Sequence, residues 1–281
     1  MFVAASTECL PELGIVEAIE RFADLEYTSV EIALHEPRPA PAPAAEGQGG
    51  MSSWSGSIPW TATSTWATAG GKYLTPALVA ADTERSIKLC RDTHRLTLAS
   101  YSLDWPQDEN YYAHFAAVCK LAKATKVVTL TVPAAELGTP FNQEIERLKQ
   151  LVQIASVDGI LVGLKTEVGT LTENPDTAVA LCDNVKGLGI TLDPSHYVCG
   201  PWNGRSYDQL LKYVVHVHLR DTKKDRFQVK VGQGEIEYGK IIASLELQKY
   251  NHALSVHITP QEDIDHHGEL RKLRLLLESM L

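Results

Sequence analysis

The sequence predicts an α/β fold, a single (β/α)8 barrel of the TIM type with a long insertion after its second strand. Three observations lead to this prediction. The chain has 281 residues, of which 44% are hydrophobic, so it can bury one large core. Short apolar runs rich in β-branched residues alternate eight times with segments of helical periodicity. An open doubly wound sheet is the alternative, and it is less favoured because no glycine-rich nucleotide loop follows any strand.

The expected strands are nearly continuous apolar runs, as in a parallel sheet that is covered on both faces. They are Phe2–Ser6, Ser29–Leu34, Leu96–Ser102, Lys126–Val132, Ile160–Glu167, Gly189–Asp193, Val214–Leu219 and Ala253–Ile258. The expected helices carry apolar residues three and four positions apart. They are Leu13–Leu25, Thr83–Thr93, Tyr112–Lys123, Asn142–Val157, Asp176–Asn184, Asp208–Tyr213, Tyr238–Gln248 and Gly268–Met280. Together they predict one domain over residues 1–281.

Residues 36–81 interrupt this alternation. Prolines occupy every second position from Pro37 to Pro43, which favours extended chain, and a stretch rich in Ser, Thr and Trp follows. Because the segment follows the second strand, in a barrel it would be a long loop on the catalytic face. Its tryptophans anchor this loop to the barrel or form part of a lid over a substrate; they are Trp54, Trp60 and Trp66.

Composition excludes several classes of protein. The formal net charge of -9 argues against general nucleic-acid binding, which depends on a basic surface. No apolar run approaches the roughly 20 residues that a membrane helix needs. The N-terminal residues lack the basic start and apolar stretch of a secretory signal. Five scattered cysteines without CxxC spacing are typical of reduced thiols, so we expect a cytoplasmic protein.

Four polar residues stand at the ends of the last four expected strands. They are Glu167, Asp193, His218 and His257. In a barrel the carboxyl ends of successive strands surround one point, so these side chains are expected to converge. Carboxylate oxygens and imidazole nitrogens are the ligands of divalent ions of the Mg, Mn and Zn group. Each residue alone has an ordinary structural interpretation, as a helix cap or a hydrogen-bonded histidine. Four in succession predict a metal site.

Other polar residues lie close to these positions in the sequence. His216 has the same strand face as His218 but is one layer deeper, so we interpret it as a core histidine or one that supports a ligand. The turn after Asp193 brings His196 back toward the metal or into a loop hydrogen bond. Of the cations that follow the seventh strand, one could hold a substrate hydroxyl or phosphate. The turn Val231-Gly232-Gln233-Gly234-Glu235 is only weak evidence of phosphate binding.

Three motifs resemble one known family. The segments Leu192-Asp193-Pro194-Ser195-His196, His216-Val217-His218-Leu219-Arg220-Asp221 and Val231-Gly232-Gln233-Gly234-Glu235-Ile236 are similar to those of xylose isomerase-like TIM barrels, the sugar phosphate isomerases and epimerases. Ketose 3-epimerases and inosose dehydratases are relatives. The resemblance covers residues 1–35 and 82–281. It implies metal ligation by Glu167, Asp193 and His218. It also implies substrate contacts by His196, Arg220, Lys224 and Glu31.

The chain departs from this family at the eighth strand. The family has a glutamate there that binds the metal and acts as the second acid or base, whereas this chain has His257. Epimerisation needs one proton-transferring group on each face of the carbon, and a metal-bound neutral imidazole is a poor base. Two carboxylates and two imidazoles would also make the ion a stronger Lewis acid and favour Fe, Co or Zn over Mg and Mn.

The leading hypothesis is therefore an isomerase or epimerase that depends on one divalent metal ion (Mn, Zn, Co or Fe). It would act on a sugar, sugar phosphate or polyol through a metal-stabilised enediolate, with Glu167 as the catalytic residue. A lyase that dehydrates an inosose or a 3-keto sugar at the same site is the alternative, and a catalytically decayed carbohydrate-binding barrel is a third hypothesis. The family resemblance also implies a homo-oligomer. An apurinic-site endonuclease is disfavoured because the required DxH pair after the seventh strand is missing.

Overall fold

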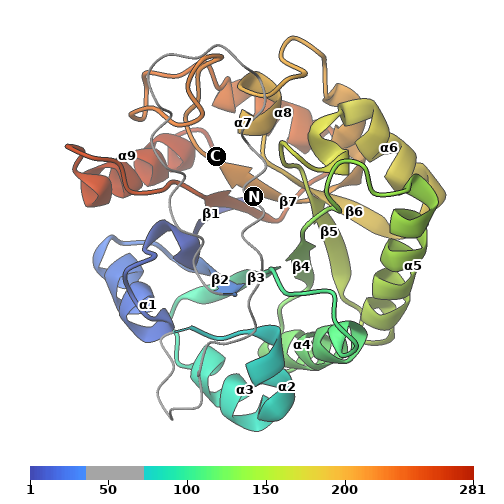
Figure 1. The fold of residues 1–281 in the computed structure, drawn as a ribbon. Coiled ribbons are helices and arrows are strands. Elements are labelled where there is room, and N and C mark those ends of the chain that lie inside the picture. The colour runs from blue at the N-terminus through green and yellow to red at the C-terminus, as the bar shows by residue number, and fades with distance from the viewer. Residues whose placement is uncertain (36–72) are drawn as a thin grey trace.

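The computed structural model of the protein describes residues 1–35 and 73–281. Its parallel strands form one closed barrel in chain order, surrounded by helices (Figure 1). The strands are β1 (Phe2–Ser6), β2 (Ser29–Leu34), β3 (Thr97–Leu103), β4 (Thr129–Val132), β5 (Leu161–Lys165), β6 (Leu188–Leu192), β7 (Val214–Leu219) and β8 (Ala253–Val256). The first and last strands close the barrel, with Phe2 opposite Ala253. The predicted (β/α)8 barrel is confirmed.

The helices lie on the outside of the barrel. They are α1 (Ile15–Asp24), α2 (Pro76–Ala81), α3 (Thr83–Arg91), α4 (Tyr111–Thr125), α5 (Phe141–Val157), α6 (Pro175–Asn184), α7 (Ser195–Val198), α8 (Tyr238–Leu247) and α9 (His266–Glu278), with short 3-10 turns η1 (Thr7–Cys9), η2 (Leu171–Glu173) and η3 (Asp208–Tyr213). Side-chain oxygens of Thr75, Asn174 and Asp265 accept hydrogen bonds from backbone N–H groups in the first turns of α2, α6 and α9. These caps determine where three of the helices begin.

The segment assigned to the insertion lies largely outside the described residues. The residues 36–72, with the three tryptophans, are among those that the structure does not describe. The end of the assigned segment contains α2, a helix that the sequence pattern did not predict. The side chain of Tyr73 donates a hydrogen bond to the carbonyl of Pro11, at 2.8 Å, so the described chain resumes beside the loop that follows β1.

The hydrophobic core lies between the strands and the helices. Alternate strand residues point outward, and Ile32, Leu192 and Val217 among them have no exposed surface. They belong to one cluster that includes Phe22 of α1 and Leu148 of α5. Because successive residues of a strand point to opposite faces, the remaining residues of each strand point into the barrel.

The interior of the barrel is unusually polar. The hydroxyls of Thr131 on β4 and Thr191 on β6 lie 2.8 Å apart, a contact that crosses the interior because β5 separates these strands. Glu31 on β2 reaches His216 and His218 on β7 in the same way. TIM-barrel interiors are ordinarily filled by branched apolar side chains. Buried polar groups need partners, so these cross-barrel hydrogen bonds determine how the strands are arranged around the site.

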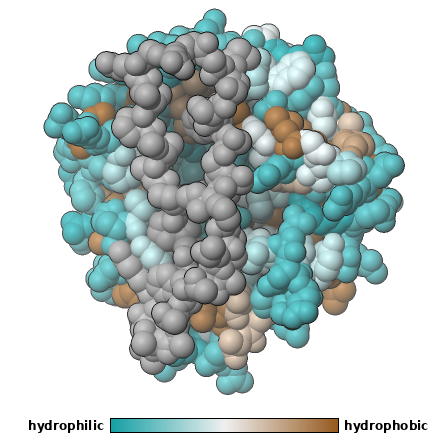
Figure 2. Space-filling model, viewed as in Figure 1, coloured by the Kyte–Doolittle hydropathy of each residue, from teal (hydrophilic) through white to brown (hydrophobic). Residues whose placement is uncertain are grey.

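The outer surface carries charged and polar side chains. Figure 2 shows one face that is mostly hydrophilic where its residues are described, with hydrophobic residues in small separate groups. Within the described ranges, no helix is both long and apolar enough to cross a membrane.

Candidate metal centre and active site

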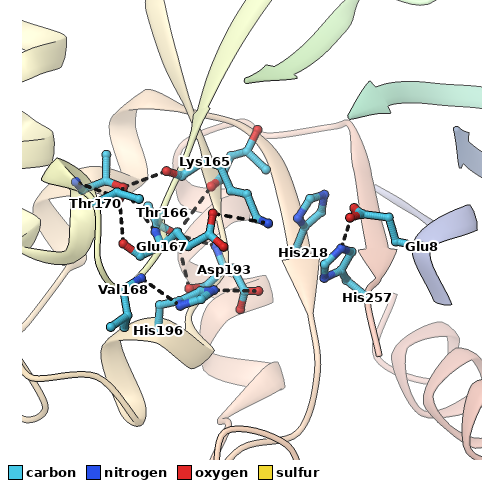
Figure 3. A network of polar contacts seen from close by, with 12 residues as sticks. Glu8, Lys165, Thr166, Glu167, Val168, Thr170, Asp193, His196, His218 and His257 are labelled. Carbon is cyan, nitrogen blue, oxygen red and sulfur yellow. Dashed lines mark hydrogen bonds and ion pairs between the residues drawn. The ribbon is translucent and has the colours of Figure 1, made fainter. Parts of the chain in front are cut away.

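The four predicted metal ligands all lie at the carboxyl ends of their strands. Asp193 directly follows β6, His218 is the fifth residue of β7, and His257 directly follows β8. Glu167 stands two residues beyond β5. The barrel therefore brings all four to the same mouth, as Figure 3 shows. Asp193 and His218 have no exposed surface, and His257 is buried.

Asp193 is held by three donors. Its Oδ1 accepts hydrogen bonds from the backbone N–H of Ser195, at 3.0 Å, and from the Ser195 hydroxyl. Its Oδ2 lies 2.9 Å from Nη2 of Arg220. Burial alone would raise the pKa of Asp193, but the Arg220 guanidinium and nearby polar groups lower it below its ordinary value. Asp193 is therefore an ionised carboxylate within the barrel mouth.

His257 uses both of its ring nitrogens. Its Nδ1 accepts a hydrogen bond from Nη2 of Arg220, and its Nε2 donates to Oε2 of Glu8 at 2.8 Å. Its ring is stacked on that of His218, with centroids 4.4 Å apart. Burial lowers the pKa of His257 to about 4, so the ring is neutral. Ligation of a metal by His257 stays a prediction, and it requires exchange of either Arg220 or Glu8 for the ion.

Glu167 lies beside a cation that the sequence pattern did not identify. Nζ of Lys165, the last residue of β5, is 3.6 Å from Oε2 of Glu167. Both side chains are largely buried, with 14% and 18% of their surfaces exposed. The backbone N–H of Glu167 donates to the hydroxyl of Thr172, at 3.2 Å, which fixes the start of the loop after β5. Glu167 therefore combines limited solvent access with a nearby positive charge.

His196 is fixed in one neutral tautomer. Its Nδ1 accepts a hydrogen bond from the backbone N–H of Val168, at 3.1 Å, so the ring proton is on Nε2. That nitrogen lies 3.7 Å from Oδ2 of Asp193. Burial lowers the pKa of His196 to about 4. The short helix α7 carries His196 back over Asp193, and the ring lies 4.6 Å from that of Phe227.

The two cationic residues predicted to contact substrate after the seventh strand differ in burial. Arg220 is buried, contacts Asp193 and His257, and stacks its guanidinium on Phe227 at 4.6 Å. Lys224 is exposed in the turn between Lys223 and Arg226, whose backbones pair with each other. Contact with a substrate therefore stays a prediction for both, and only Arg220 lies among the buried polar groups.

Glu31 on β2 contacts both histidines of β7. Its carboxylate contacts Nε2 of His216 through Oε2 and Nε2 of His218 through Oε1, the latter at 2.9 Å. The hydroxyl of Ser100 donates to Oε2 at 2.8 Å. Burial alone would raise the pKa of Glu31, but His218 and His216 lower it well below its ordinary value. In the described part of the chain, Glu31, His216 and His218 are the group whose ligand atoms lie within 4.8 Å of one another and could hold a metal ion.

Glu8 and His35 also belong to the site, although the sequence did not identify them. Oε1 of Glu8 is 3.1 Å from Nε2 of His35, and its Oε2 bonds His257. Burial alone would raise the pKa of Glu8, but His35 and His257 lower it well below its ordinary value. Glu8 stands two residues beyond β1, as Glu167 does beyond β5, so the same strand-end pattern contained the signal.

The glycine-flanked turn has an internal role. Backbone N–H groups of Gly232 and Gly234 donate to Oδ2 of Asp221, at 2.7 and 2.9 Å. A Cβ atom at Gly234 would lie 1.9 Å from Oδ1 of Asp221, so only glycine fits there. These amides satisfy a carboxylate of the chain itself, and the turn contributes to the site by holding the segment that follows Arg220.

The charge and donor set of the mouth fit a divalent cation. Glu8, Glu31, Glu167 and Asp193 supply four carboxylates, whereas Lys165 and Arg220 supply two cations, an excess of two negative charges when histidines are counted as neutral. Buried charge without compensation is costly. In addition, Nδ1 of the fully buried His218 has no hydrogen-bond partner within the described residues. An imidazole lone pair and carboxylate oxygens are suitable ligands for such an ion.

The comparison with known families agrees with this architecture. The model of the xylose isomerase-like TIM barrel family matches residues 19–274, most of the chain. The chain belongs to this family. No curated protein sequence matches it.

Several solved structures share this fold at low sequence identity. A D-tagatose 3-epimerase-like protein is 18% identical, with a TM-score of 0.67 over 100% of this chain and 98% of its own. A family member from Mycobacterium smegmatis in complex with magnesium is 14% identical, with a TM-score of 0.68 over 99% and 97%. A probable 3-DHS dehydratase from Bacillus anthracis is 13% identical, with a TM-score of 0.66 over 99% of this chain and 99% of its own.

Proposed function

We propose that this protein is a divalent-metal-dependent isomerase or epimerase that acts on a sugar, sugar phosphate or polyol. The observation that carries the proposal is that Glu167, Asp193 and His218 stand at the carboxyl ends of successive strands, at a barrel mouth with an excess of negative charge. Membership in the xylose isomerase-like family, together with likeness in fold to an epimerase-like protein and a probable dehydratase, supports an enzyme of this class.

Three residues are proposed to hold the metal ion. Asp193 and Glu167 offer carboxylate oxygens, and His218 offers the lone pair of Nδ1. His257 is the fourth proposed ligand, in exchange for its bond to Arg220 or Glu8. The likeness to a barrel in complex with magnesium supports a divalent ion in this fold. Imidazole ligands favour Zn, Co or Fe, whereas carboxylates also suit Mn. Such an ion supplies Lewis-acid stabilisation of negative charge on substrate oxygens.

Glu167 is proposed to move the proton at the carbon next to the substrate carbonyl. It is the partly exposed carboxylate among the proposed ligands, with 18% of its side-chain surface accessible. Nζ of Lys165 lies 3.6 Å from its Oε2, and a carboxylate can accept a proton as a general base. A proton held by Glu167 can return to the neighbouring carbon, which gives isomerisation. Its return to the same face of the same carbon regenerates the substrate, so epimerisation needs a proton donor on the opposite face.

Two neighbouring residues are proposed to position the substrate. The tautomer of His196 directs an N–H group from Nε2, which can donate to a substrate hydroxyl. Arg220 offers a guanidinium backed by the ring of Phe227. The guanidinium binds carboxylates and phosphates through paired donors, so it can recognise an anionic or hydroxylated substrate once Asp193 ligates the ion.

Dehydration is the second candidate function, and one observation favours it. The eighth strand ends in neutral His257, so the mouth lacks a carboxylate there to act as a second base. A single base that removes a proton, followed by loss of water, needs no group on the other face of the carbon. The probable dehydratase among the similar structures supports this alternative.

The proposed function is tested by product analysis in deuterated water. The protein, loaded with Mn²⁺ or Co²⁺, is incubated with ketohexoses such as D-tagatose, ketose phosphates and inososes, and the products are followed by NMR. Isomerisation conserves composition and introduces deuterium at carbon, whereas dehydration releases water and forms a double bond. Inertness toward all of these classes, with and without metal, would contradict the proposal.

Glu167→Gln is the variant that tests the assigned proton transfer. Turnover should fall by about 10² to 10⁴-fold, because general acid–base groups contribute rate factors of that order. Glu136→Gln, at an exposed position in a neighbouring loop, is the matched control and should retain full turnover. Full activity in the Glu167 variant would remove this residue from the mechanism.

A further inference from the structure

A cluster across the barrel interior connects Glu31 with the metal site. Glu31 lies on β2, and its carboxylate faces Nε2 of both His216 and His218 on β7. The hydroxyl of Ser100 on β3 donates to the same carboxylate, at 2.8 Å. All four side chains have at most 1% exposed surface. The contacts are therefore shielded from water.

The chemistry of the carboxylate fixes the tautomer of His218. An ionised carboxylate only accepts hydrogen bonds, so the ring nitrogen facing it must carry the proton. His218 places Nε2 at 2.9 Å from Oε1 and 3.2 Å from Oε2 of Glu31. In a neutral ring the other nitrogen, Nδ1, then carries the lone pair. This is the nitrogen that has no hydrogen-bond partner within the described residues.

We infer that Glu31 is a positioning residue that selects the Nε2–H tautomer of His218 and thereby presents Nδ1 as a metal ligand. This inference rests on the proposed metal site. Histidine ligands commonly donate their second N–H to a carboxylate, which fixes the ring orientation and raises the basicity of the ligating nitrogen. Glu31 has this relation to His218, and Ser100 and His216 in turn hold Glu31 in place.

The contacts within the cluster are hydrogen bonds that an ion bound there would have to replace. Nε2 of His218 lies 2.9 Å from a carboxylate oxygen of Glu31, so this nitrogen shares its proton with Glu31 and has no lone pair for an ion. The cluster of Glu31, His216 and His218 is therefore a support for the ion site.

Replacement of Glu31 by glutamine changes the hydrogen-bond donors and acceptors of the cluster while the side chain keeps its size. In Glu31→Gln the side chain offers one acceptor and one NH2 donor, so it cannot accept protons from both histidines through separate oxygens. Where the NH2 group faces His218, the ring must carry its proton on Nδ1, and the lone pair that would bind a metal is lost. Ser100→Ala is the matched control, because it removes a donor to Glu31 and leaves the acceptor to His218 intact.

The first test measures the tautomer without metal. Protein with ¹⁵N-labelled histidine is freed of metal with a chelator, and long-range ¹H–¹⁵N correlation spectra identify the protonated nitrogen of His218. We expect the Nε2–H form in the wild type and in S100A, and a gain of the Nδ1–H form in E31Q. A wild-type His218 in the Nδ1–H form would overturn the inference, and this result does not depend on any activity or metal.

The second test measures Mn²⁺ binding by titration calorimetry. E31Q should bind Mn²⁺ about 10 to 100-fold more weakly than the wild type, as expected for the loss of a carboxylate behind a ligand, and S100A should stay within about threefold. Equal affinity in E31Q, or a requirement for His216 with none for Asp193, would overturn the inference. A wild type that binds no Mn²⁺, Co²⁺ or Zn²⁺ would contradict the proposed function. The role of Glu31 is tested separately by the tautomer of His218, which is measured without metal. If E31Q does not fold, the tautomer of His218 in the wild type still tests the inference.

Discussion

Arg220 shows how single residues define the mouth of this barrel. One guanidinium contacts Asp193 and His257 while its face covers the ring of Phe227. Two of the four predicted metal ligands thus have a positively charged partner from the chain itself. The guanidinium of Arg220 neutralises the charge of Asp193. If a metal ion bound the Asp193 carboxylate instead, the guanidinium would become available to the substrate, so Arg220 would couple metal binding to substrate recognition.

The buried histidines predict acid sensitivity. Burial lowers the pKa of His196 to about 4, against an ordinary value of 6.5. The unfolded chain therefore takes up this proton below about pH 6.5, while the folded protein does not until about pH 4. Stability from this residue is fully present above pH 6.5 and is lost as the pH falls toward 4, by up to roughly 3 kcal/mol at about 1.4 kcal/mol per pKa unit.

His196→Gln tests this prediction. Glutamine can accept from the backbone N–H of Val168 and has no titrating group, so the loss of stability between pH 7 and 4.5 should shrink by about 2 kcal/mol. Urea unfolding in the presence of a chelator measures it. The half-exposed His94 is the control, and His94→Gln should keep the wild-type pH dependence. An unchanged slope in the His196 variant would mean that this ring is not buried in its neutral form.

At the scale of elements, the turn after β7 is defined by the Asp221 carboxylate. The amides of Gly232 and Gly234 bond one of its oxygens, and the amide of Thr222 bonds the other at 3.1 Å. This arrangement holds the chain between Arg220 and α8 against the barrel. The sequence indicated a tight glycine turn here, but the anion that it binds comes from eleven to thirteen residues earlier in the chain, which no local pattern reveals.

Gly234→Ala should disturb this turn. Its Cβ would lie 1.9 Å from Oδ1 of Asp221, so the carboxylate must move and lose hydrogen bonds from backbone amides. We expect a loss of about 1–3 kcal/mol in the free energy of unfolding, the usual range for overpacking. Gly239→Ala on α8 is the control, because a Cβ there has no atom within 4 Å and alanine favours a helix. Equal stabilities of the two variants in urea would contradict this account of the turn.

The strands show how far the sequence determines the fold. The ranges Phe2–Ser6, Ser29–Leu34 and Val214–Leu219 were predicted with the bounds that the structure has, because continuous apolar runs between polar turns leave little choice. The strand expected at Lys126–Val132 is shorter, Thr129–Val132, because Lys126 has a left-handed backbone that ends α4. The short helix α7 was missed, since four residues are too few to display a periodicity.

At the scale of the whole molecule, the barrel explains which parts of the site could be predicted. Asp193 and His218 were found because each stands at the end of an apolar strand, a position that (β/α)8 topology directs to one mouth. The contacts from Glu31 to β7 and from Glu8 to His257 join residues 185 and 249 positions apart, so only the closed barrel reveals them. The prediction of a homo-oligomer stays a prediction.

The central claim, a divalent ion held at the barrel mouth, is tested most directly by an anomalous difference map from crystals grown with Mn²⁺. The account predicts one strong peak next to Nδ1 of His218 and the carboxylates of Asp193 and Glu167. A map without a peak at the mouth, or with its peak among Glu31 and the Nε2 atoms of His216 and His218, would contradict it.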